Sequence, residues 1–86
     1  MMFSFHPEAE IEFESGLGED FALEVASTID RIIAHPKAWP IIEGDIRRCL
    51  TNRFPFGVLY SGEPDSIFIL AVMHLHRRPD YWKNRK

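Results

Sequence analysis

The side chains best suited to chemistry gather at the C-terminal end of this 86-residue chain. His74 and His76 stand two residues apart, and Arg77, Arg78 and Tyr81 follow shortly after. Histidine or tyrosine can move a proton and arginine can stabilise a phosphoryl transition state, so these side chains suit RNA cleavage by internal attack of the 2′-hydroxyl. His74, His76, Arg78 and Tyr81 are therefore the candidate catalytic residues. The alternative is a solvated basic tail, because no carboxylate is obviously placed to orient a histidine.

The two histidines do not by themselves predict a metal site. Residues two apart on a strand point the same way, so His74 and His76 could face one ion together. Zinc usually takes four ligands, and no third ligand stands at a recognisable spacing. We therefore expect no metal and no other cofactor.

The element that must position this tail is an uninterrupted apolar run over residues 67–73. It predicts a buried strand over 67–74 that is apolar on both faces. Alternation places its side chains on two faces, with Ile67, Ile69, Ala71 and Met73 on one and Phe68, Leu70, Val72 and His74 on the other. One long helix and a connector can cover only one of these faces. The second face is therefore a candidate site for a partner chain.

The remaining elements predict an α+β domain. An apolar stripe of helical period predicts a helix over 19–34, with Glu19 and Asp20 at its start and Pro36 beyond its end. Residues 2–5 predict a strand. Residues 7–15 predict a short helix that begins at Pro7, although their apolar residues are spaced by two as in a strand. The Gly-Leu-Gly segment at 16–18 breaks the chain between the two helices.

Strands are also expected over 45–54 and 56–60, followed by a hairpin loop over 61–66. In the first of these strands Ile46, Leu50 and Phe54 share one side. Residues 35–44 are expected to form a connector in which Trp39 and Ile41 fold back over the end of the helix.

Composition limits the possible classes. A chain of this length forms one domain, residues 1–86, and its content of 45% hydrophobic and 13% aromatic residues excludes disorder. Cys49 is the only cysteine, so no internal disulfide can form, and without an activating base we expect an inert thiol. The apolar run is too short to span a membrane, and no charged-then-apolar leader opens the chain. We therefore expect a cytoplasmic protein.

Charge is unevenly distributed along the chain. Residues 1–36 hold eight acidic side chains and one basic, whereas residues 37–86 hold nine basic and five acidic. The basic half could meet an acidic partner protein or nucleic acid, or the two halves could neutralise each other within the fold. Because the pI is near 5.7 and few aromatic residues interleave with the arginines, an acidic protein segment suits Arg47, Arg48 and Arg53 better than nucleic acid does.

Seven short segments occur together in one order: FHPEAE (5–10), GLGEDF (16–21), HPKAWP (35–40), IRRCL (46–50), RFPF (53–56), AVMH (71–74) and RPDYW (78–82). This ordered set resembles the RelE/ParE superfamily, the toxins of bacterial type II toxin–antitoxin systems, also called plasmid-stabilisation proteins. The resemblance implies a short N-terminal strand and a helical region packed on a small antiparallel sheet. The chain departs from the family in one respect. The helix expected over 7–15 is followed directly by Gly16, whereas family members usually continue this helix further, so the usual helical hairpin is truncated.

The pattern looks more like the ParE branch, whose members inhibit DNA gyrase. The RelE-like branch cuts mRNA on the ribosome with basic residues in the sheet and a tyrosine near the C-terminus, a place comparable to that of Tyr81. Its basic positions fall here near Leu75 and around Pro55 and Phe56, which are not basic. The resemblance therefore implies a gyrase inhibitor, with a ribosome-dependent mRNA endonuclease as the alternative and an inactive antitoxin-binding relative as the third possibility.

The implied partners are a cognate antitoxin laid over the exposed sheet face and DNA gyrase at the basic C-terminal edge, with a homodimer as a further possibility. The residues expected to bind them are Arg47, Arg48, Arg53, Phe68, Leu70, Arg77, Arg78 and Trp82.

Overall fold

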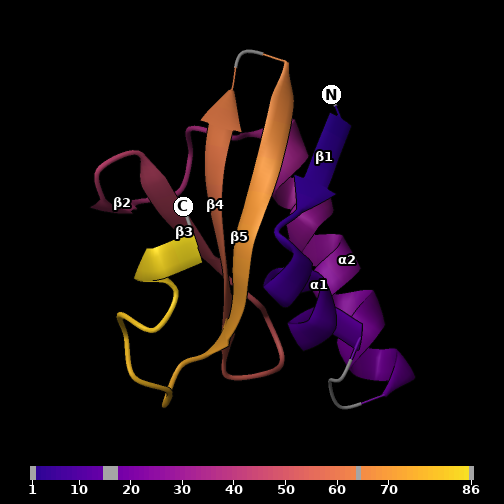
Figure 1. Cartoon of the computed structure of the whole chain (residues 1–86). Helices are drawn as coiled ribbons and strands as arrows, with labels where there is room; N and C mark the ends of the chain where they lie inside the picture. Colours follow the sequence, from indigo (N-terminus) through magenta and orange to yellow (C-terminus); the bar gives the residue numbers. More distant parts are fainter. Residues whose placement is uncertain (1, 15–17, 64, 86) are drawn as a thin grey trace.

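The computed structural model describes residues 2–14, 18–63 and 65–85, and for Glu63 the backbone alone. The elements run β1 (Met2–Phe5), α1 (Pro7–Glu14), α2 (Glu19–Ala34), β2 (Ile41–Glu43), β3 (Ile46–Leu50), β4 (Phe56–Glu63), β5 (Ser66–His74) and the 3-10 turn η1 (Lys83–Arg85). The strands form one sheet in the order β1-β5-β4-β3-β2, in which only β1 and β5 are parallel. The helices lie on one side of the sheet and the C-terminal segment on the other (Figure 1). The predicted α+β class is confirmed.

The helix layer is built on α2. Its stripe of Phe21, Val25, Ile29 and Ile32 is buried against the residues that β3, β4 and β5 direct to this side, namely Cys49, Val58, Tyr60, Ile67, Ile69 and Val72. The predicted bounds of this helix are confirmed. It begins after Gly18, whose φ of 98° lies in the left-handed region that favours glycine.

The short helix α1 is also confirmed, although its apolar residues are spaced as in a strand. His6 favours the helix: its Nδ1 accepts a hydrogen bond from the Glu8 backbone N–H at 3.1 Å, which caps a helix that Pro7 can start without loss. Ala9 is fully buried against the sheet. Residues 15–17, where the helix was expected to end and the chain to break, lie outside the described residues.

A β-bulge in β5 corrects the predicted division of its faces. Leu59 pairs with Ala71 and Tyr60 with Ile69, so Leu70 is the extra residue. Beyond it the alternation shifts by one, and Ala71 and Met73 join the face opposite the helices. The prediction that they share a face with Ile67 and Ile69 is therefore wrong.

The second face of the sheet is covered by the chain itself. Trp82 is 4% exposed and packs in a cluster with Ile46, Leu59, Leu70, Ala71 and Met73. The C-terminal segment crosses this face in Figure 1. The expectation that the chain cannot cover both faces is wrong, because it counted the helix and the connector but not the tail.

Several boundaries differ from prediction in the middle of the chain. Trp39 packs against the core as expected, but Ile41 is 55% exposed and begins the unpredicted strand β2. Strand β3 stops at Leu50 because the next residues turn: the Thr51 backbone N–H donates to Phe56 O at 3.0 Å. Phe54 then packs edge-on against Phe21 on the helix side, away from the side on which it was predicted.

The hairpin between β4 and β5 is longer than predicted, since both strands run into the segment expected to be loop. Among the described residues, no helix is long and apolar enough to cross a membrane.

Candidate functional site

A cavity of about 540 Å³ lies between the second face of the sheet and the C-terminal segment. Leu59, Met73 and Trp82 form its buried apolar floor. The rest of its lining is contributed by β2, β3 and the tail: Ile42, Glu43, Arg48, Arg78, Pro79, Asp80 and Lys83. An apolar floor with a few charged groups around it is the usual composition of a ligand site.

The three cations of the cavity are not equivalent. Lys83 Nζ lies 2.9 Å from Glu43 Oε1, and Arg78 Nε lies 3.2 Å from Asp80 Oδ1. Both pairs are solvent-exposed and therefore weak. The Arg48 backbone N–H donates to Pro40 O at 3.1 Å, but the Arg48 side chain makes no hydrogen bond or ion pair with another residue in the described part of the chain, so its guanidinium is free to receive an anion.

Strand geometry positions Arg48. It alternates with Arg47 on β3, and it shares the cavity side with Ile46. Its stem lies over Gly57 of β4, where an added Cβ would meet Arg48 Cγ and Cδ at 3.1 Å. A glycine at this position therefore lets the arginine lie flat across the sheet.

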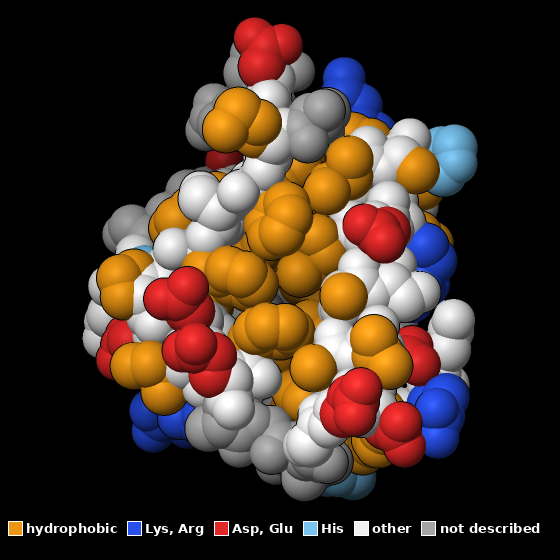
Figure 2. Space-filling view, turned by 90° about the vertical axis from the view of Figure 1, so that its right-hand side faces the viewer, with side chains coloured by type: hydrophobic (Ala, Val, Ile, Leu, Met, Phe, Trp, Pro, Cys, Tyr) orange, Lys and Arg blue, Asp and Glu red, His pale blue; other side chains and the backbone are white. Residues whose placement is uncertain are grey.

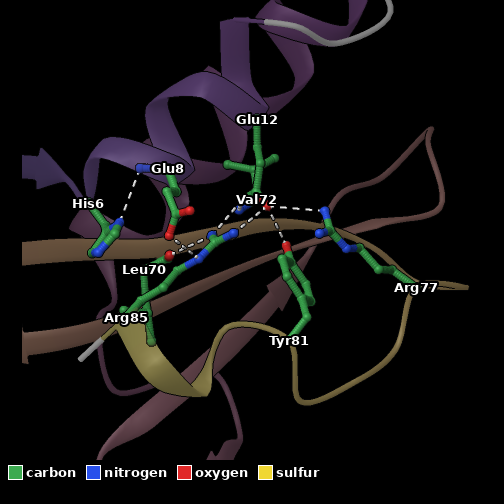
Figure 3. Close-up of polar contacts among 8 residues, drawn as sticks. All are labelled: His6, Glu8, Glu12, Leu70, Val72, Arg77, Tyr81 and Arg85. Atoms are coloured by element: carbon green, nitrogen blue, oxygen red, sulfur yellow. Dashed lines mark hydrogen bonds and ion pairs between the residues drawn. The ribbon is translucent and has the colours of Figure 1, made fainter.

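The tail that closes the cavity is held by Glu12 of α1 (Figure 3). Glu12 Oε1 accepts hydrogen bonds from Arg85 Nη1 at 2.9 Å and from the Val72 backbone N–H at 3.0 Å. Oε2 accepts from Arg85 Nη2 at 2.9 Å and from the Tyr81 hydroxyl at 2.7 Å. Arg77 completes the group with an ion pair to Oε2 at 3.5 Å.

The sheet explains why these groups meet. Strand β1 pairs with β5 only as far as Phe5 and Ile69, and the chain then turns into α1. Beyond Ile69, β5 is no longer paired with β1. There the Val72 backbone N–H donates to the Glu12 carboxylate, and the Leu70 carbonyl accepts a hydrogen bond from Arg85 Nη1 at 3.2 Å. Side chains thus complete the hydrogen bonds that a longer β1 would have made.

The same contacts set the protonation of the group. Burial alone would raise the pKa of Glu12, but hydrogen bonds from Arg85, Tyr81 and Val72 hold it below its ordinary value. Burial and the hydrogen bond to Glu12 raise the pKa of Tyr81 well above its ordinary value. The Tyr81 ring also lies between two guanidinium groups, with Arg77 Cζ 3.7 Å and Arg85 Cζ 4.8 Å from its centroid.

Comparison with solved structures gives the fold a precedent. The isolated Escherichia coli RelE toxin matches with a TM-score of 0.74 over 96% of this chain and 93% of that chain, at 15% sequence identity. The chain has the fold of the RelE toxin. A chromosomal ParDE toxin–antitoxin system from P. aeruginosa matches with a TM-score of 0.51, at 14% identity over 88% of this chain and 97% of that chain. No family model and no curated protein sequence matches.

The resemblance to RelE/ParE toxins is thereby confirmed at the level of fold. Of the two structures, RelE is the more similar, whereas the sequence pattern favoured the ParE branch. Identities this low do not assign a branch.

On this RelE fold the four candidate catalytic residues do not form one site: the rings of His74 and His76 lie together, 5.2 Å between centroids, apart from the cavity that Arg78 lines. His74 packs its ring against Phe56 on the helix side, 4.9 Å between centroids, and its Nδ1 accepts from the His76 backbone N–H at 3.1 Å. His76 is exposed, and the Tyr81 hydroxyl is engaged by Glu12. Of the four, only Arg78 lines the cavity. Among the described residues, no group of three or more His, Cys, Asp or Glu side chains comes together as a metal site.

The expected partner-binding residues also divide. Arg48, Arg78 and Trp82 line the cavity. Arg47 donates to the Trp39 carbonyl at 2.7 Å and so holds the connector. The others are spread over the molecule: Leu70 is buried, Phe68 packs partly buried beside it, and Arg53 and Arg77 are exposed.

Sequence reasoning missed Glu12 and Glu43, and it treated Lys83 and Arg85 only as cations of the basic tail. Glu12 was one of eight acidic residues in its half of the chain, and its partner Arg85 stands 73 positions away. The only available signal was the charge asymmetry, which predicted that the halves could neutralise each other without naming a pair.

Proposed function

We propose that the protein is the toxin of a type II toxin–antitoxin pair and that it arrests translation by binding mRNA on the ribosome in the cavity described above. The observation that carries the proposal is the Arg48 guanidinium, which has no partner among the described residues and lies over an apolar floor in a domain with the RelE fold. A guanidinium presents several N–H donors to a phosphate, and the floor offers apolar surface to a base or sugar.

The proposed activity is binding of the mRNA and does not include its cleavage. In the described lining of the cavity, the carboxylates are Glu43 and Asp80, and each is held in an ion pair. Cleavage of the mRNA, the alternative activity, needs a general base and a general acid within reach of the phosphate. His76, exposed on the loop after β5, would be the base to test first.

A second candidate is inhibition of DNA gyrase, as the sequence pattern favoured. Two observations support it: the similarity to a ParDE system, and a cavity whose described lining contains no histidine or tyrosine. Gyrase inhibition requires only a protein-binding edge. In either case a cognate antitoxin is the proposed neutralising partner.

The experiment compares Arg48→Ala with the matched control Arg53→Ala, since Arg53 is an exposed arginine outside the cavity. The purified proteins are tested for retention on mRNA-programmed ribosomes, for mRNA cleavage and for inhibition of gyrase supercoiling. We expect wild type and Arg53→Ala to bind programmed ribosomes and Arg48→Ala to bind about ten- to a hundredfold more weakly, the loss for one hydrogen-bonded charge.

Inhibited supercoiling with no ribosome binding would show that the target is gyrase and not the ribosome. Equal ribosome binding by Arg48→Ala and Arg53→Ala would show that the cavity does not bind the mRNA. No growth defect on expression without an antitoxin would favour an inactive relative.

A further inference from the structure

The outer edge of β1 is open. In the described part of the chain, this strand ends the sheet order and pairs only with β5. The His6 backbone N–H donates to Ile69 O on β5. Because alternate residues of a strand direct their backbone groups to the same side, the N–H and C=O of Ser4 also point to β5. Those of Phe3 and Phe5 therefore point outward, and among the described residues no hydrogen bond reaches them. An unpaired strand edge is a template for another strand.

An apolar strip flanks this edge on the helix side. Phe3, Phe5 and Phe13 form a ladder of rings, with centroids 5.7 Å and 5.5 Å apart, and Ile33 of α2 packs partly buried against the same core. Phe3 keeps 43% of its surface exposed. Figure 2, which views the side where β1, α1 and α2 lie, shows hydrophobic side chains gathered in a hollow with acidic side chains beside it. The short α1 leaves this part of α2 uncovered.

The surroundings of the strip are acidic. Glu10 and Glu14 on α1 and Asp30 on α2 are exposed and make no ion pair with another described residue. The only basic residue in positions 1–36 is Arg31, which donates to Thr28 Oγ1 and to Leu50 O near β3. The open edge thus has an apolar floor and a negative field.

We propose that β1 is the docking site for an extended segment of another protein, which pairs with the outward backbone groups of Phe3 and Phe5. Its apolar side chains lie over the strip, and its lysine or arginine residues continue beside α1, where they meet Glu10 and Glu14. Strand addition obtains affinity from the backbone and specificity from alternate side chains. The site is separate from the cavity, so the inference stands or fails independently of the proposed function.

Charge selects this occupant over a second copy of the chain. Two copies joined through β1 would bring two acidic surfaces together, and like charges at an interface oppose association. A partner segment carrying cations gains from the same field. Anionic lipid is disfavoured for the same reason as a second copy.

The probe for the test is a labelled peptide in which valine alternates with threonine and which ends in lysines, and its binding is measured by fluorescence anisotropy with the whole protein. Phe3→Asp should weaken binding by at least about tenfold. The matched control Ile11→Asp, an exposed apolar residue on the outer face of α1, should leave binding unchanged. Charge reversal of Glu10 and Glu14 to lysine should weaken binding and abolish its salt dependence.

Amide hydrogen exchange gives a second measurement that does not depend on variants. On binding, the amides of Phe3 and Phe5 should become protected, whereas that of Ser4 is already protected in the free protein. Unchanged exchange at Phe3 and Phe5 would refute strand addition. Equal binding of a scrambled peptide, or a dimer of the free protein that Phe3→Asp dissociates, would overturn the proposed occupant.

Discussion

Replacing Glu12 by glutamine should destabilise the protein far more than a single surface charge can. The side chains of Glu12 and Arg85 are only 14% and 8% exposed. Removing one partner of a buried pair costs about 3–5 kcal/mol, and a hydrogen bond to a charged group contributes about 1.5–3 kcal/mol. Arg85 retains Glu8 at 3.4 Å and the Leu70 carbonyl, and glutamine keeps one acceptor oxygen. We therefore expect a loss of about 2–3 kcal/mol in the free energy of unfolding.

Urea denaturation followed by circular dichroism measures this loss. The matched control is Glu10→Gln, which removes an exposed charge from the same helix and should change the free energy of unfolding by less than about 0.5 kcal/mol. A double-mutant cycle with Arg85→Met should give a coupling free energy of about 2 kcal/mol. Equal effects of Glu12→Gln and Glu10→Gln would show that Glu12 does not hold the tail.

The pH dependence of the same loss has a definite sign. The folded-state pKa of Glu12 lies below its ordinary value, so its contribution is present above that ordinary value and is lost as the pH falls through the folded-state pKa. The difference in stability between wild type and Glu12→Gln should therefore shrink as the pH falls from about 6 to about 3. A difference that stays constant over this range would refute the assigned ionisation.

Three further predictions follow from the same contacts. Burial raises the pKa of Tyr60 to about 12 and also raises that of Tyr81, so the stability gained from the neutral phenols is present below their ordinary value of 10.0 and is lost as the pH rises above it. Ultraviolet titration should show no tyrosinate step near pH 10 in the native protein and a full one in guanidinium. Gly57→Ala should displace the Arg48 stem and weaken ribosome binding about tenfold with little change in Tm, and unaltered binding would show that the stem accommodates the methyl group. Cys49 is fully buried with a raised thiol pKa, so a disulfide reagent should modify it much more slowly in the native than in the unfolded protein, and equal rates would contradict its burial.

The helix layer could be predicted from the sequence because its signals are local. The apolar stripe of α2 repeats with the helical period, and its ends carry acidic residues and a nearby proline. The strand at residues 2–5 and the pairing of β4 with β5 follow from short runs bounded by turn residues. Local periodicity of this kind needs no knowledge of the tertiary contacts.

The face assignment of β5 failed because a bulge leaves no mark in an apolar run. Leu70 and Ala71 are both compatible with either face, and only the pairing of Leu59 with Ala71 shows where the alternation shifts. The shift decides which side chains reach the cavity: it brings Met73 to the cavity floor and takes His74 to the helix side. A candidate site that depends on strand parity is lost when the parity changes.

The uneven charge of the chain is resolved by the fold in two ways. Part of it is neutralised internally, because Glu8 and Glu12 of the acidic half meet Arg77 and Arg85 of the basic half. The charges that remain outside these ion pairs are positive at one site and negative at the other. Among the described residues, the side chain of Arg48 in the cavity has no ion-pair partner, and neither do the carboxylates beside the open edge of β1. The two proposals therefore call for partners of opposite charge, at sites so placed that neither partner needs to displace the other.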